Sequence, residues 1–110
     1  MGAITATATA TITNGESVGN AFYVGAKLPV SLQMPAAFTG ATVSFQGSGD
    51  GVTYQALYIG AAAYSETVTV SKNVQLDSSQ FAGFPWLKIV SASAEGAARS
   101  IVVHTRAPGR

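Results

Sequence analysis

Two alternating segments on either side of the glycine-rich turn at residues 47–51 restrict this chain to a β architecture. Before the turn Val43 and Phe45 alternate with polar residues, and after it Val52 and Tyr54 do the same. Alternation with a period of two is typical of strands that bury one face. The Asp-Gly pair supplies the positive φ angle that a tight turn needs. The sequence therefore predicts an antiparallel hairpin whose last turn glycine has a positive φ.

The first thirteen residues alternate even more regularly, with threonine on one face and alanine or isoleucine on the other from residue 3 onward. Burial of an alanine face contributes little compared with burial of valine or leucine. Residues 1–13 are therefore either an N-terminal strand of the domain or an arm that pairs with a neighbouring chain, and the thin alanine face favours the arm. The threonine row supplies four candidate contact residues, Thr5, Thr7, Thr9 and Thr11.

Further alternating segments follow along the chain, and no stretch has sustained helical periodicity. Pro29 cannot donate to a ladder, so its segment is expected to lie at a sheet edge or to begin there. Residues 1–110 are predicted to form one all-β domain, an antiparallel β-sandwich of the jelly-roll type with seven to nine short strands, and a closed barrel is the alternative. Strands are also expected over residues 67–71, 74–76, 86–91 and 99–106, a helical turn over 77–80, and a tail over 107–110.

Charged residues make up only 10% of the chain, against about 25% in an ordinary soluble domain. Small monomers usually depend on surface charge for solubility, and depleted charge is typical of the buried centre of subunit interfaces. We therefore expect neighbouring chains to cover part of the surface, and a neutral domain that is soluble alone is the alternative. The net charge is +1 and no apolar run is long enough to cross a bilayer, so neither a nucleic-acid nor a membrane partner is expected.

Residues that carry catalysis or bind metals are sparse. The chain has no cysteine and one histidine, His104, whereas a zinc site needs three or four protein ligands. No serine lies in a nucleophile-elbow context before a helix. The loop around Asp50 has a single carboxylate, and calcium needs several oxygen ligands. We therefore predict no enzymatic activity, no metal, no cofactor and no small-molecule substrate, and we expect the acidic residues to serve turns: Glu16, Asp50, Glu66, Asp77 and Glu95.

Ten aromatic residues are spread along the chain, and most of them have the parity of a buried strand face. We expect these rings to fill the core of the sandwich. Two large rings at Phe84 and Trp86 cannot easily both enter a small core, so an exposed aromatic surface is predicted there. The aromatic candidates for contact with a partner are Phe84, Trp86, Tyr58 and Tyr64.

Three segments together resemble a known class of protein: LPVSLQMPAAFTGATVSFQGSGDGVTYQAL, FAGFPWLKIVS and AARSIVV. They are similar to small virion proteins of tailed bacteriophages, in particular the capsid decoration or cement class with a β-sandwich or jelly-roll domain. The resemblance covers residues 28–103, and its hairpin motif also occurs in phage tail and fibre domains.

The resemblance implies a structural protein of the virion that binds the assembled capsid surface and reinforces it. It implies the major capsid protein as the partner and a homo-oligomer, either a dimer or a trimer, and it supplies no catalytic residues. The alternative is a carbohydrate-binding or tail- and fibre-associated module, which would use Trp86, Tyr58 or Tyr64 as an exposed aromatic surface.

Overall fold

The structure, a computed structural model, describes residues 5–81 and 83–107. Of the predicted tail, only Ala107 lies among the described residues. The one helical element in these ranges, η1, has four residues, and no helix in them is long and apolar enough to span a membrane. The elements are β1 Thr5–Ile12, β2 Phe22–Tyr23, β3 Leu28–Gln33, β4 Thr42–Ser48, β5 Gln55–Ala56, β6 Tyr58–Ile59, β7 Ala62–Ala63, β8 Ser65–Thr67, β9 Asn73–Gln75, η1 Ser78–Phe81, β10 Trp86–Ser91 and β11 Arg99–Arg106.

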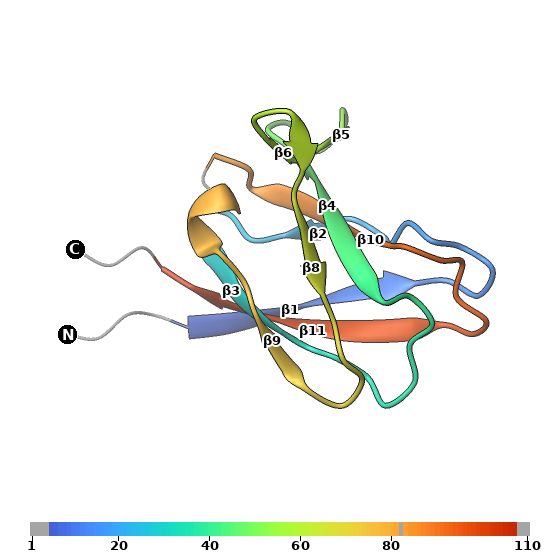
Figure 1. The fold of residues 1–110 in the computed structure, drawn as a ribbon. Coiled ribbons are helices and arrows are strands. Elements are labelled where there is room, and N and C mark those ends of the chain that lie inside the picture. Colours follow the sequence, from blue (N-terminus) through green and yellow to red (C-terminus); the bar gives the residue numbers. More distant parts are fainter. Residues whose placement is uncertain (1–4, 82, 108–110) are drawn as a thin grey trace.

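Nine of the strands form a two-layered antiparallel sandwich (Figure 1). One sheet has the order β1-β11-β3-β9, and the other has the order β2-β10-β4-β5, with β8 also paired to β4. The pairing is nested, because β1 pairs with β11, β2 with β10, β3 with β9, and β4 with β8. A long hairpin rolled into two sheets in this way is a jelly roll. The predicted sandwich is therefore confirmed, and a closed barrel is excluded.

The N-terminal segment is a strand of its own domain, so the predicted arm is wrong. β1 pairs with β11 along all eight residues, and the two strands run side by side in Figure 1. Ala10 and Ile12 are fully buried, whereas Thr7 and Thr9 are exposed on the outer face. The continuous backbone ladder orders the strand even though its buried side chains are small. Residues 3–4, which the alternating pattern includes, lie outside the described residues.

The central hairpin forms, although its second strand is shorter than predicted. β5 pairs with β4 through only two residues, Gln55 and Ala56. Gly51 has a φ of 77°, which confirms the predicted positive φ. Residues 52–54 belong to the turn, because the Asp50 carboxylate accepts hydrogen bonds from backbone N–H groups there. This local bonding replaces the ladder that the alternating pattern suggested.

β3 lies inside its sheet, between β11 and β9, so the predicted edge position is wrong. Pro29 is the second residue of the strand, and the pairing with β9 begins only at Ser31. The missing N–H of the proline therefore interrupts no bond to β9, which agrees with the alternative that the strand begins there. The register with β11 shifts between His104 and Thr105, and Pro29 is buried beside this irregularity.

The strand predicted over residues 67–71 is also displaced. β8 ends at Thr67, and the chain then turns so that Ser71 has a φ of 59° and donates its N–H to the Pro35 carbonyl at 3.0 Å. A strand residue does not adopt this left-handed conformation. The predicted strand near residue 74 and the predicted helical turn are both present, as β9 and η1.

The core between the sheets is built around three aromatic rings. Phe45 and Phe81 meet edge to face with their centroids 4.9 Å apart, and Tyr64 lies 5.6 Å from each of them. Offset and edge-to-face contacts are the favourable arrangements for aromatic pairs. Further fully enclosed hydrophobic side chains come from both sheets, among them Ile12, Leu32, Val43, Leu87, Ile89, Ile101 and Val103.

Candidate contact surface

A short hairpin, β6–β7, projects from the sandwich and exposes every one of its residues. Tyr58 pairs with Ala63, and Ile59 pairs with Ala62. Gly60 has a φ of 64° at the first central position of the two-residue loop, the arrangement of a type II′ turn. The side chains of Tyr58 and Ile59 are 60% and 48% exposed, and no residue of the hairpin is charged. We call residues 58–63 the apolar finger; β6 stands at the top of Figure 1.

The apolar finger is fixed to the core at its base. Leu57 donates its N–H to the Phe45 carbonyl at 2.9 Å, and Tyr64 donates its N–H to the Leu57 carbonyl at 2.9 Å. Leu57 and Tyr64 are both buried. The finger is therefore held by two buried residues at its base, while its own side chains contribute nothing to the core.

Tyr64 is a core residue, so its prediction as an exposed contact residue is wrong. Its hydroxyl donates to Glu66 Oε2 at 2.7 Å and accepts the Asp77 N–H at 3.1 Å. Burial of the ring and the hydrogen bond to Glu66 raise the pKa of the Tyr64 hydroxyl to about 12. The residue thus joins β8 to the start of η1 instead of facing a partner.

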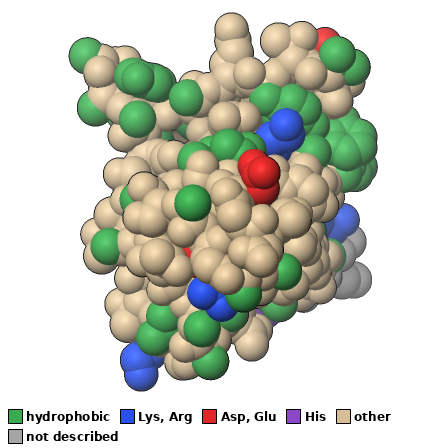
Figure 2. Space-filling view, turned by 90° about the vertical axis from the view of Figure 1, so that its right-hand side faces the viewer, with side chains coloured by type: hydrophobic (Ala, Val, Ile, Leu, Met, Phe, Trp, Pro, Cys, Tyr) green, Lys and Arg blue, Asp and Glu red, His purple; other side chains and the backbone are tan. Residues whose placement is uncertain are grey.

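The outer face of the five-stranded sheet carries a second apolar area. Tyr23 and Trp86 lie opposite each other on β2 and β10, with ring centroids 4.8 Å apart and planes tilted by 57°. Beside them the Lys88 ammonium lies 4.4 Å from the centroid of the Tyr54 ring, close enough for a cation–π contact. Figure 2 shows hydrophobic side chains gathered beside a basic group in the upper part of one face, whereas most of that face is neutral.

The two rings expected to be exposed near residue 85 are both half-buried. Phe84 covers the backbone of Gly47, where a Cβ atom would meet its ring at 2.8 Å. The Trp86 indole lies against Gly51 of the hairpin turn in the same way, at 2.9 Å. These rings therefore support the turn, and the planes of Tyr23 and Trp86 are too strongly tilted for the two rings to form one flat surface together.

The single carboxylate of the hairpin loop, Asp50, is hydrogen-bonded within the loop through one of its oxygens. Asp50 Oδ1 accepts the Val52 and Thr53 N–H groups at 2.9 and 3.0 Å and the Ser48 hydroxyl at 2.9 Å. The hydrogen bonds from Thr53, Val52 and Ser48 lower the pKa of the Asp50 carboxyl to about 2. Among residues 5–81 and 83–107, no three His, Asp or Glu side chains gather as a metal site would require. Asp50 therefore holds the loop in shape.

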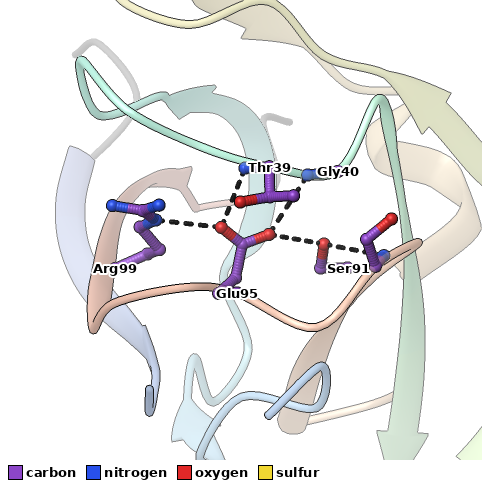
Figure 3. Close-up of polar contacts among 6 residues, drawn as sticks. Thr39, Gly40, Ser91, Glu95 and Arg99 are labelled. Carbon is purple, nitrogen blue, oxygen red and sulfur yellow. Dashed lines mark hydrogen bonds and ion pairs between the residues drawn. The ribbon is translucent and has the colours of Figure 1, made fainter. Parts of the chain in front are cut away.

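Glu95 is the one fully buried carboxylate in the described part of the chain, and it ties loops together (Figure 3). Its oxygens accept the Thr39 N–H at 2.8 Å, the Gly40 N–H at 3.1 Å, the Ser91 hydroxyl at 2.8 Å and Arg99 Nε at 2.9 Å. Burial by itself would raise the pKa of the Glu95 carboxyl, but these four donors together lower it to about 2. A carboxylate satisfied in this way is a structural group and not a general base.

The part of the predicted threonine row whose side chains the structure describes lies where the pattern placed it, on the outer face of the other sheet. Thr7 and Thr9 are exposed and Thr11 is half-buried, while Thr5 lies opposite Arg106 on β11. His104 lies next to Thr7 on the same face and makes no side-chain hydrogen bond among the described residues. This face is polar and nearly uncharged, and it is separate from the apolar finger.

The sequence interpretation identified Tyr58 but missed its neighbours in the apolar finger. The uncharged run YIGAAA around Gly60 was the available signal. Tyr23 was also missed, although it alternates with the apolar residues Phe22 and Val24, and this alternation places it on the opposite face of a strand.

Comparisons with known proteins show a shared fold and no family. No model of a known protein family matches the chain, and no curated protein sequence matches it. The fold is similar to that of the SPBc2 prophage-derived protein YomS, with a TM-score of 0.58 and 14% sequence identity, over 94% of this chain and 96% of that chain. CBM32-1 from a family 31 glycoside hydrolase of Clostridium perfringens has a TM-score of 0.42 and 14% identity, over 87% of this chain and 72% of that chain, which is too distant to support an argument.

Proposed function

We propose that this chain is a structural virion protein without enzymatic activity, which binds the assembled surface of a phage capsid through the apolar finger and reinforces the shell. The observation that carries the proposal is the exposure of residues 58–63, an uncharged segment that lies outside the core of its own domain. Aromatic residues are enriched and charged residues depleted at the centre of protein interfaces. An exposed apolar segment with this composition is typical of an interaction site.

The length and fold of a similar solved protein support a role for this chain as a phage protein. The SPBc2 prophage-derived protein matches this chain over nearly the whole of both molecules. The two chains therefore share one small fold along nearly their whole matched length. The low charge of the surface also favours a protein that is covered by neighbours on a particle.

Reinforcement follows from selective binding. A protein that binds the assembled capsid but not its separated subunits stabilises the assembled state by mass action. When many copies bind one particle, their contributions to the stability of the shell add together. The major capsid protein is the proposed partner, and the outer capsid surface is the proposed location.

Cosedimentation tests the role of the apolar finger. Purified chain is mixed either with assembled capsids or with unassembled capsid subunits, and binding to the assembled form alone is expected. Burial of a large apolar side chain is worth about 1.5–3 kcal/mol, so Tyr58→Ser together with Ile59→Ser should weaken binding by at least about tenfold. The matched control is Val70→Ser, which changes a residue 41% exposed in the β8–β9 turn, at the opposite end of the molecule in Figure 1.

Equal binding by the finger variant and the wild type would show that another surface makes the contact. Failure of the wild type to sediment with capsids, combined with binding to tails or to glycans, would replace the capsid proposal with the tail or carbohydrate alternative. The finger lies outside the core, so both variants should melt at the wild-type temperature.

A further inference from the structure

β1 is an edge strand with one side open. It lies at the end of the order β1-β11-β3-β9, and β11 is its only strand partner in the part of the chain that the structure describes. Thr11 donates its N–H to Asn20 Oδ1 at 2.7 Å, and its carbonyl accepts the Asn20 N–H at 2.9 Å. The backbone of Thr11 therefore points away from β11, toward the edge of the sheet. Asn20 closes the edge at this one residue.

The direction of the other backbone groups follows from the ladder. In an antiparallel pair, alternate residues direct both N–H and C=O toward the neighbouring strand, and those between direct both away. Thr9, Thr7 and Thr5 share the parity of Thr11, so their N–H and C=O groups face the open edge. None of them has a hydrogen-bond partner on that side within residues 5–81 and 83–107.

This edge lacks the features that usually protect an exposed strand. Natural edges are shortened, bulged, or marked with proline or charged side chains, lysine above all. The opposite edge of the same sheet, β9, has three residues and follows Lys72 directly. β1 has eight residues of sequence TATATATI, with no charge, proline, glycine or bulge.

We infer that the open edge of β1 pairs antiparallel with β1 of a second copy of this chain, which joins the two four-stranded sheets into one continuous sheet. Pairing about a two-fold axis places Thr7 opposite its own equivalent and Thr5 opposite Thr9 of the second copy. In this register, the backbone groups of Thr5, Thr7 and Thr9 that face the open edge all gain hydrogen bonds to the second copy. The inference does not depend on capsid binding.

The composition of β1 selects a second copy over a foreign strand. A two-fold contact brings the same patch of both subunits together, so a charged residue near the axis would face its own like charge. β1 has no charged residue, and small β-branched side chains pair well when they face each other across strands. A two-fold contact also closes on itself, so the product is a dimer and not an open chain.

Substitutions at Thr7 can remove the contact between the two copies while the fold of each copy is kept. The Thr7 N–H faces the open edge and makes no bond to β11, so Thr7→Pro removes a donor that only the dimer uses. Thr7→Lys places a charge at the two-fold axis, as protected natural edges do. Thr7→Ser is the matched control, because it changes the side chain but keeps the N–H group and the neutral character.

Light scattering and hydrogen exchange give the readout. We expect the wild type and Thr7→Ser to have twice the 11.2 kDa mass of one chain and Thr7→Lys and Thr7→Pro to have the single-chain mass with unchanged circular dichroism. In the wild type, the Thr7 and Thr9 amides should be protected; in Thr7→Lys the Thr9 amide should exchange quickly, while Ala8 and Ala10 stay protected.

A wild type of single-chain mass up to the highest soluble concentration would overturn the inference. A trimer, or a dimer that Thr7→Lys and Thr7→Pro leave intact, would overturn it as well. If Thr7→Pro fails to fold, Thr7→Lys alone decides the question, because a lysine on an exposed edge is compatible with the strand.

Discussion

Glu95→Gln should destabilise the domain strongly, because it removes the charge that holds three segments together at one end of the sandwich. The carboxylate binds the 39–40 segment, Ser91 and Arg99, and the backbone of the same residue pairs with Gly15 and Glu16. Glutamine keeps the shape of the side chain. However, its NH₂ group faces donors where the carboxylate oxygen accepted hydrogen bonds.

The size of the effect follows from the lowered pKa of the carboxyl. Its pKa falls from an ordinary 4.5 to about 2, which corresponds to about 3 kcal/mol of stabilisation at neutral pH. Loss of one partner from a buried ion pair costs a similar amount, about 3–5 kcal/mol. For a domain of this size, the melting temperature should fall by about 10–20 °C.

The pH dependence identifies the charge as the cause. Because the pKa of Glu95 is lower in the folded protein, its stabilisation is complete above pH 4.5 and is lost as the pH falls toward 2. Urea unfolding followed by circular dichroism should therefore show a difference of about 3 kcal/mol between wild type and Glu95→Gln at pH 7, and a much smaller difference near pH 2.

Glu16→Gln is the matched control, because it makes the same change at an exposed turn and should alter stability by less than about 0.5 kcal/mol. The reasoning is refuted if Glu95→Gln costs less than about 1 kcal/mol at pH 7, or if the difference from wild type is the same at both pH values.

Three further predictions concern the turn, the core and the first strand. Gly51→Val should lower stability by more than about 1 kcal/mol, since φ is positive and the Trp86 indole occupies the space; an unchanged melting temperature would contradict this. Tyr64→Phe should cost about 1–2 kcal/mol and remove the late step near pH 12 from the ultraviolet titration of the four tyrosines. Because the pKa of Tyr64 is raised, its stabilisation is complete below pH 10 and is lost as the pH rises through 12; a late step that persists in the variant would mean that another tyrosine is responsible. Deletion of residues 5–12 should abolish folding, since it removes the whole ladder to β11; dispersed amide signals in the NMR spectrum of the deleted protein would show that β1 is dispensable.

Period-two alternation predicted the long strands well because each of them buries one face and exposes the other. β4 and β10 show the pattern in its simplest form, with Phe45 and Ile89 inward and Gln46 and Lys88 outward. The turn at Gly51 was also predictable, since a local requirement for positive φ has a local sequence signature. The nested pairing of the jelly roll was expected only as a fold class, because the partners of each strand lie far away in the sequence.

The errors have a common physical origin in contacts that no local pattern records. The order of β1 comes from its ladder with β11, so the small size of Ala8 and Ala10 was a poor guide. Tyr64 is buried with its hydroxyl satisfied by Glu66 and by the Asp77 N–H, and the second of these partners lies 13 residues away in the sequence. The apolar finger has two-residue strands, which are too short to show any period.

Genome release from heated particles tests the proposed role most directly. Capsids that lack this chain are incubated with increasing amounts of it, and the temperature of DNA release is followed with a fluorescent dye. The release temperature should rise with occupancy and reach a plateau when all sites are filled, because the chain stabilises only the assembled shell. The finger variant Tyr58→Ser with Ile59→Ser should require far more protein for the same rise. A release temperature that stays constant at full occupancy of the capsid would contradict reinforcement of the shell by this protein.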